Sequence, residues 1–490
     1  MKATLHQLFR TRPADGQSAS VPVHRRTLLQ WFGAWSASFS SGATWPQTAV
    51  PLSPLGTGME EPPRLALLIG NRNYPGGDDL PPIHKNVKDL RAALELRGFS
   101  VTQGLDLDLA QAREAFSRFA NEVRAAPPDA TVFFYFSGHG AQVDAENLLV
   151  SANLSPKAGQ DHLIRGSLRL SQDVVGQLPR RPRGLTMAVV DACRTSLREV
   201  ATGDGLNQVE APPGCLIAFA TGAGTPAIAP ADDTRNTFYT GSLVKLLGSS
   251  SDEISFSDLF KLVKYDVQNT MLNHPVALLR QFAQYPFIAE NTQVVRRLAP
   301  AVLVADRGTG APLVADPAGA ATRFTSRTEA VDWEQLQELV WPADVARLAD
   351  DYLRNHPGSR LTASVQVARE GALEAALILR RKEVRLFRSA FDLSAQASPV
   401  HRADLAKAGR GDKDAAARLA RSYRRDAGRS DNGRFEGWSQ FAAALGNGIA
   451  AYELALHYRR VEQPLLAAQY ESRARELGYT PPPSLDNTRK

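Results

Sequence analysis

The sequence predicts an α/β domain, a mainly parallel sheet flanked by helices, followed by an all-α domain of helical repeats. Two observations predict the first domain: short continuous apolar runs alternate with segments of helical spacing, and turn residues separate them. This alternation is typical of a parallel sheet that is covered on both faces. A third observation, a repeat of about 35 residues near the C-terminus, predicts stacked helix pairs.

The chain has 490 residues, which is too long for a single ordinary core, so we expect several domains. A Pro/Gly-rich linker and a later connector rich in Pro, Gly and Ala mark the boundaries. The predicted parts are an N-terminal targeting or disordered segment with its linker, the α/β domain, the connector and the helical domain, at 1–62, 63–295, 296–345 and 346–490.

Apolar runs predict the strands, and apolar residues at helical spacing predict the helices between them. In the first helix, for example, Val87, Leu90 and Leu94 share one face and Gly98 ends the pattern. The predicted strands lie at 64–70, 99–105, 131–142, 148–152, 185–193 and 215–221. The predicted helices lie at 85–97, 108–125, 170–178, 238–247 and 255–270.

Composition excludes several classes of function. The net charge of +6 comes from 57 basic and 51 acidic residues that are interleaved along the chain, which argues against a nucleic-acid partner. There is no run of 18 or more uncharged apolar residues, so no membrane-spanning helix is expected. The two cysteines, Cys193 and Cys215, are too few for a disulfide framework or a zinc cluster, and Cys215 opens an apolar run typical of inert core.

The N-terminus carries a candidate export signal. Arg25 and Arg26 are followed by two leucines and a mildly hydrophobic stretch rich in Ala, Ser and Gly. This pattern resembles a twin-arginine signal and predicts a periplasmic or secreted protein. The alternative is a disordered tail with a short amphipathic helix on a cytoplasmic protein.

Two chemically competent residues stand at the carboxyl ends of predicted strands. His139 lies between Gly138 and Gly140 after a run of aromatic residues, and Cys193 ends the run 185–193. Ligand sites of open parallel sheets form beyond the carboxyl ends of the strands. A thiol needs a proton acceptor to react as a thiolate, and imidazole is the usual one. If the two strands are neighbours, the sequence predicts a nucleophilic site there.

These motifs resemble the caspase-like cysteine peptidases, which include caspases, metacaspases and bacterial relatives. The matching stretches are LALLIGNRNYP, KDLRAALELRGF, FFYFSGHG and VVDACR, and AFATGAGTPAIAPADDTRNTFYTGSL is similar to the small-subunit region. The resemblance implies that Cys193 attacks the scissile carbonyl while His139 protonates the leaving amine and then activates water. It also implies an oxyanion hole made by the backbone N–H groups of Gly140 and Cys193.

Substrate specificity is predicted from an acid near the thiol. Asp191 precedes Cys193 by two residues, so the two side chains face the same side of a strand. An anion there tends to raise a thiol pKa, and it makes sense if it meets a substrate cation. Metacaspases, which cleave after Arg or Lys, have an aspartate at this position, and their second acid corresponds to Asp89. The alternative is that Asp191 caps a loop and Asp89 is a solvated helix residue; Lys88 would also neutralise part of such a pocket.

Cofactor and processing predictions are limited. The sequence predicts no cofactor and no metal site, and calcium activation, known in part of the family, stays open because the adjacent acids Asp232 and Asp233 are typical of an exposed loop. The segment 194–214 contains Arg194 and Arg198, at which self-cleavage is a hypothesis.

The C-terminal repeat pairs GDKDAAARLARSY (411–423) with GNGIAAYELALHY (446–458) and is similar to Sel1-type repeats. The leading prediction is therefore a cysteine endopeptidase that cleaves protein or peptide substrates after Arg or Lys, with a possible protein partner at the repeats. One alternative is a catalytically idle caspase-like scaffold. Another is an interaction protein that acts through its repeats alone.

Overall fold

The computed structural model describes residues 62–143, 146–196, 209–222, 230–281, 283–292, 294–298, 324, 326–392, 397–425 and 432–479. The predicted export signal around Arg25 and the candidate cleavage residue Arg198 lie outside this part of the chain. Within it, no helix is long and apolar enough to cross a membrane.

The first domain is built on a mainly parallel mixed sheet, as predicted. Its main path runs in the order β2-β1-β3-β6-β7-β8, with β4 and β5 added at the end of β3. The strands are parallel except for the β3–β4, β4–β5 and β7–β8 pairs. The bounds are β1 (Arg64–Gly70), β2 (Phe99–Leu105), β3 (Thr131–Val143), β4 (Glu146–Val150), β5 (Ser167–Arg169), β6 (Leu185–Ser196), β7 (Cys215–Phe219) and β8 (Phe287–Asn291).

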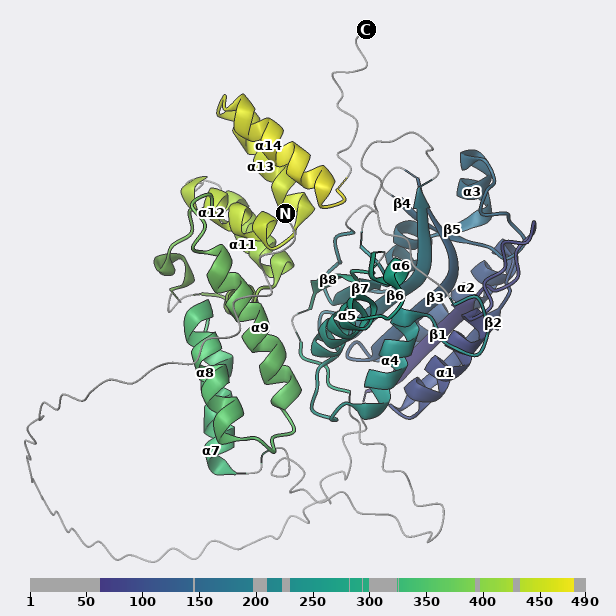
Figure 1. Ribbon diagram of the computed structural model, residues 1–490, viewed down its shortest axis with the longest axis horizontal. Coiled ribbons are helices and arrows are strands. Elements are labelled where there is room, and N and C mark those ends of the chain that lie inside the picture. The colour runs from purple at the N-terminus through teal and green to yellow at the C-terminus, as the bar shows by residue number, and fades with distance from the viewer. Residues whose placement is uncertain are drawn as a thin grey trace, which may run out of the picture. The chain divides into compact units, whose positions relative to one another are not determined.

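Helices cover both faces of this sheet because successive strand residues point to opposite sides. In β1, Leu68 joins the core cluster formed with α1, α4 and α5, whereas Ile69 joins the cluster formed with α2. Figure 1 shows α1, α4 and α5 on the near side of the sheet. The helices are α1 (Ile83–Glu95), α2 (Leu109–Ala125), α3 (Gln160–Gly166), α4 (Phe238–Ser249), α5 (Phe256–Leu272) and α6 (Ala277–Gln281).

Local irregularities account for the differences from the predicted elements. The helix predicted at 170–178 is a short π-turn at Leu170–Val174 followed by a 3₁₀ turn at Val175–Gln177. The strands β5 and β8 and the helix α3 were not predicted, since each is short and carries polar residues that obscure its pattern. Of these, β8 matters most because it ends the main path of the sheet.

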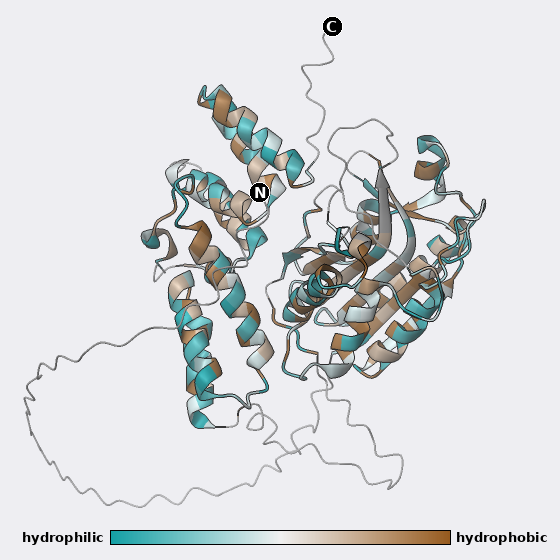
Figure 2. Ribbon diagram, viewed as in Figure 1, coloured by the Kyte–Doolittle hydropathy of each residue, from teal (hydrophilic) through white to brown (hydrophobic). Residues whose placement is uncertain are grey.

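An all-helical region follows, as predicted. Its helices are α7 (Arg327–Glu338), α8 (Pro342–Asn355), α9 (Thr362–Ile378), α10 (Pro399–Gly409), α11 (Lys413–Arg425), α12 (Asn432–Ala444), α13 (Gly448–Arg460) and α14 (Pro464–Glu476). Figure 2 shows hydrophobic and hydrophilic residues side by side around these helices, which is typical of helices that bury one face. The region begins at Arg327 and not at residue 346, because Ser326 caps α7 and Pro342 opens α8 inside the predicted connector.

The predicted repeat coincides with a recurring helix end. Gly411, Gly446 and Gly478 have φ angles of 78°, 102° and 84°, which favour glycine, and each follows a helix. The next residue donates its N–H back to the carbonyl five positions earlier in all three places. The structure thus repeats the same turn, and assignment of the repeats to the Sel1 type stays a prediction.

Candidate functional site

The parallel register of β3 and β6 brings the predicted dyad residues together. His139 is the register partner of Cys193, and Ser137 is the partner of Asp191 two residues earlier. Neighbouring strands lie about 4.8 Å apart, so the backbones of His139 and Cys193 are adjacent at the carboxyl-terminal part of the sheet. Only the backbone of Cys193 is described. The same register places Gly140 next to this pair, opposite Arg194.

The His139 ring is oriented by a backbone carbonyl. Its Nε2 lies 2.7 Å from the carbonyl oxygen of Asp78. A carbonyl can only accept a hydrogen bond, so Nε2 carries the proton and the Nδ1 of a neutral ring keeps its lone pair. Burial lowers the pKa of His139, an effect that the Asp78 carbonyl and carboxylate oppose and that Lys157 reinforces. The ring is therefore neutral at pH 7, the state that accepts a proton from a thiol.

Tyr74 fixes the backbone beside this histidine. Its hydroxyl accepts a hydrogen bond from the His139 N–H at 3.0 Å and donates to the carbonyl of Val150 at 3.2 Å. The two rings also meet edge to face, with centroids 4.6 Å apart. Glycine at position 138 leaves room for this tyrosine, because a Cβ atom there would lie 2.6 Å from the Tyr74 hydroxyl and one of the two would have to shift.

Asp191 is a buried carboxylate held by two hydroxyl groups. Thr237 and Thr240 both donate to its Oδ2, at 2.5 and 2.6 Å. The residue is 3% exposed, and this desolvation raises its pKa, although the threonine hydrogen bonds oppose the shift. A neighbouring cation would stabilise the ionised form, so the position is chemically suited to recognise a positive charge.

The hydrogen-bond network around Asp191 extends to α1 through Asn86. The Asn86 amide donates to Thr237 Oγ1 at 3.0 Å and to Ser137 Oγ at 3.3 Å, and its Oδ1 accepts from the Thr237 N–H at 3.1 Å. Sequence reasoning missed Asn86, Thr237 and Thr240. A signal exists for Asn86, since this fully buried amide shares the apolar face of its helix with Leu90.

Asp89 has a different environment from the one expected. Its carboxylate lies 2.8 Å from the ammonium of Lys85, one helical turn earlier, and the pair is partly exposed. The described contacts link Asn86, and not Asp89, to the residues around Asp191. Lys88, which was expected to offset the charge of the pocket, is exposed, and Lys85 is the cation that contacts Asp89.

The second cysteine lies in a buried environment that disfavours its thiolate. Cys215 begins β7, is buried, and has its pKa raised to about 11 by desolvation. It therefore stays a thiol at neutral pH, in agreement with the prediction that it belongs to the core.

Neither of the two adjacent acids considered for calcium is isolated. Asp232 accepts hydrogen bonds from Thr234 and pairs with Arg235 at 2.9 Å, while Asp233 lies 3.7 Å from Arg72. Within the described ranges no group of three or more His, Cys, Asp or Glu side chains is arranged to hold a metal ion. A calcium requirement stays untested.

The comparison with known families agrees with the sheet and its strand-end residues. A model of the caspase domain, of the C14 peptidase family, matches residues 63–296, which cover the whole sheet and both strand ends described above. No curated protein matches the chain.

Proposed function

We propose that this chain, whose residues 63–296 belong to the caspase domain family, is a cysteine endopeptidase that cleaves after Arg or Lys with a His139–Cys193 dyad. The observation that supports this most is the register partnership of the two residues at the ends of adjacent parallel strands. A catalytic pair drawn from two distant segments needs this kind of alignment.

The proposed chemistry uses the tautomer set by Asp78. With Nε2–H donated to the carbonyl, Nδ1 of His139 takes the thiol proton as the Cys193 sulfur attacks the scissile carbonyl. The imidazolium then donates that proton to the leaving amine, and the neutral ring later activates water to hydrolyse the thioester. The N–H groups of Gly140 and Cys193 stabilise the tetrahedral oxyanion, an interaction that typically contributes about 10²–10³ in rate per donor.

Specificity rests on Asp191 in this proposal. Its pKa is raised because burial disfavours the ionised carboxylate. A guanidinium or ammonium group of the substrate offsets this desolvation by pairing with the carboxylate. Asp89 contributes only if its ion pair with Lys85 opens when substrate binds. Protein or peptide substrates with a basic residue before the scissile bond are therefore the proposed substrate class.

A peptide-cleavage assay tests the activity directly. Fluorogenic peptides that end in Arg, Lys or Asp are incubated with the wild type, Cys193→Ala and the matched control Cys215→Ala, with and without calcium. We expect cleavage after Arg and Lys only, a loss of at least about 10³-fold in Cys193→Ala, and no loss in Cys215→Ala. No turnover by a folded wild type under any condition would favour the idle scaffold, and cleavage after Asp would refute the specificity.

A further inference from the structure

The two oxygens of the Asp191 carboxylate differ in what they can still accept. Each oxygen has two lone pairs, so an ionised carboxylate accepts about four hydrogen bonds at most. The hydroxyl groups of Thr237 and Thr240 both donate to Oδ2, at 2.5 and 2.6 Å. Oδ2 is therefore saturated by two donors of the protein, whereas Oδ1 receives neither of these hydrogen bonds.

The hydroxyl proton of Thr237 is committed to Asp191. Asn86 Oδ1 accepts the Thr237 N–H at 3.1 Å, which fixes the orientation of the amide and makes its nitrogen the donor to Thr237 Oγ1 at 3.0 Å. The backbone N–H of Thr240 also donates to Thr237 Oγ1, at 3.3 Å. Both lone pairs of this hydroxyl are thus occupied, and Asp191 is the acceptor of its single proton.

The hydroxyl of Thr240 is oriented by Tyr135. The two hydroxyl oxygens lie 2.6 Å apart, and Tyr135 is fully buried in β3. An ionised carboxylate only accepts hydrogen bonds, so Thr240 donates to Asp191 and accepts from Tyr135. Reversing this chain of hydroxyl groups would leave the carboxylate without a donor and a buried hydroxyl without an acceptor, which is costly. Both donors are therefore held on Oδ2.

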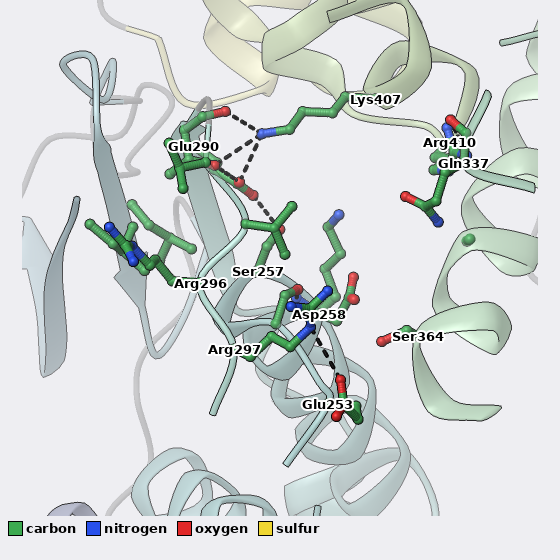
Figure 3. Close-up of a pocket in the computed structure, with 18 of the residues that line it drawn as sticks. Glu253, Ser257, Asp258, Glu290, Arg296, Arg297, Gln337, Ser364, Lys407 and Arg410 are labelled. Carbon is green, nitrogen blue, oxygen red and sulfur yellow. Dashed lines mark hydrogen bonds and ion pairs between the residues drawn. The ribbon is translucent and has the colours of Figure 1, made fainter. Parts of the chain in front are cut away.

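A second buried carboxylate shows what Asp191 lacks. Glu290, at 4% exposed, accepts from Lys407 at Oε1 and from Ser257 at Oε2, at 3.2 and 2.6 Å (Figure 3). Burial raises the pKa of Glu290, but the ammonium groups of Lys407 and Lys261 hold that pKa below its usual range. Among the described residues, no lysine or arginine stabilises Asp191 in this way, and burial raises its pKa. We therefore expect the cation for Oδ1 to come from the substrate.

A saturated Oδ2 restricts how a substrate cation can bind. A guanidinium group typically meets a carboxylate through two parallel N–H bonds, one to each oxygen. An ammonium group is a compact point charge that needs only one acceptor oxygen. The other candidate acid, Asp89, is itself paired with the ammonium of Lys85 at 2.8 Å. A substrate arginine therefore loses one of its two bonds at Asp191, whereas a substrate lysine loses none.

We propose that Thr237 and Thr240 determine specificity by leaving Asp191 a single accepting oxygen, so that the protein cleaves after Lys in preference to Arg. This inference rests on the proposed function and narrows its substrate class to peptides with a lysine before the scissile bond. Tyr135 is a positioning residue in this arrangement, because it acts on the substrate only through Thr240.

Paired peptides that differ only in Lys or Arg before the scissile bond test the inference on the full-length chain. The ratio of their kcat/KM values is independent of how much of the protein is folded. We expect a ratio of about ten in favour of Lys in the wild type, which corresponds to one charge-assisted hydrogen bond. Thr237→Ser and Thr240→Ser keep the hydroxyl groups and should keep this ratio.

Thr237→Ala and Thr240→Ala each free one lone pair of Oδ2. We expect at least one of them to lower the Lys-to-Arg ratio by about tenfold, because a guanidinium can then bond to both oxygens. Adding Tyr135→Phe to Thr240→Ala removes the buried donor that would otherwise lack an acceptor, so the fold is preserved. Tyr135→Phe alone is the matched control and should keep the wild-type ratio. A wild-type ratio of one or less, or a ratio that both alanine variants leave unchanged, overturns the inference while the proposed peptidase function stands.

Binding to Cys193→Ala separates this inference from catalysis. Calorimetry with the same two peptides gives their Kd for a protein that lacks the nucleophile. The Lys peptide should bind about tenfold more tightly, and the same alanine variant should abolish the difference. If the wild type does not cleave but Cys193→Ala still prefers the Lys peptide, the peptidase function fails and the single-oxygen pocket stands. Equal binding of the two peptides, or binding of neither, overturns the inference.

Discussion

The Nε2 atom of His139 lies 2.7 Å from the carbonyl oxygen of Asp78. This neutral carbonyl orients the imidazole ring. It stabilises the imidazolium form less than a carboxylate bonded to the same nitrogen would. Burial keeps the pKa of His139 lowered although this hydrogen bond opposes the shift, so that the ring is ready to accept a proton. The charges of Asp78 and Lys157, which lie 2.6 Å from each other, act on this pKa in opposite directions.

Removing the charge of Lys157 should move the acid limb of the pH–rate profile upward. The Lys157 ammonium lowers the pKa of His139 by disfavouring imidazolium, so Lys157→Gln raises that pKa. As the pH is lowered, the variant therefore loses its neutral ring at a higher pH than the wild type does. The acid limb of kcat/KM, measured from about pH 4 to pH 8, reports the shift.

Asp78→Asn should move the same limb the other way, because the carboxylate raises the pKa of His139 and its backbone carbonyl stays in place. Lys245→Gln, at a surface ion pair with Asp266, is the control and should leave the limb unchanged. Shifts in the same direction for the Lys157 and Asp78 variants would contradict this account of the imidazole.

Replacing Asp191 by asparagine should stabilise the protein at neutral pH and abolish cleavage after Arg and Lys. The folded-state pKa of Asp191 is raised, so its carboxylate binds its proton more tightly in the folded protein, and stability is lost as the pH rises through that pKa. The uncharged amide of the Asp191→Asn variant would escape this loss and would still accept the threonine hydrogen bonds through its oxygen. Each kcal/mol gained raises the Tm by about 2–4 °C in a domain of this size.

Melting at pH 7 and at pH 4, beside the peptide assay, checks this prediction. The gain in Tm should be larger at pH 7, where the wild-type carboxylate is most destabilising. Asp89→Asn is the comparison: it breaks only a partly exposed ion pair, so its Tm should change little. An Asp191→Asn variant that melts lower at pH 7, or that still prefers Arg and Lys, would count against the proposed role.

Gly138→Ala should reduce activity because the new Cβ displaces Tyr74. The Cβ atom would lie 2.6 Å from the Tyr74 hydroxyl, which holds the backbone N–H of His139. A displacement of about 1 Å at a reacting group typically costs about 100-fold in rate. Gly159→Ala, where no atom of the described residues lies within 4 Å of the added Cβ, is the control and should retain full activity.

Adding Tyr74→Phe to Gly138→Ala separates the clash from other effects. This double variant removes the hydroxyl that the methyl group meets, so its Tm should exceed that of Gly138→Ala alone. If the double variant and Gly138→Ala have the same Tm, the clash is not with Tyr74.

The strands could be predicted because they depend on local pattern, and so could the strand ends that carry His139 and Cys193, whose action as a dyad stays a prediction. Continuous apolar runs mark the buried strands, and the two-residue period of a strand puts Asp191 on the side of Cys193. The partners of Asp191 could not be predicted, since Thr237 lies 46 residues away in the sequence. The resemblance to metacaspases pointed to Asp89, whereas the buried face of α1 presents Asn86, the uncharged residue three positions earlier.

Asn86→Ala should destabilise the protein and slow cleavage after Arg and Lys together. It leaves the buried Thr237 N–H without its acceptor, which typically costs about 1–3 kcal/mol, and it releases the threonine that donates to Asp191. Melting and the peptide assay measure both effects, with Asn121→Ala on the exposed side of α2 as the matched amide deletion. Asp89 pairs with Lys85 and has no described contact with Thr237, so Asp89→Asn should leave both the stability and the cleavage rate unchanged. Equal losses in Asp89→Asn and Asn86→Ala would show that the acid and not the amide supports the pocket.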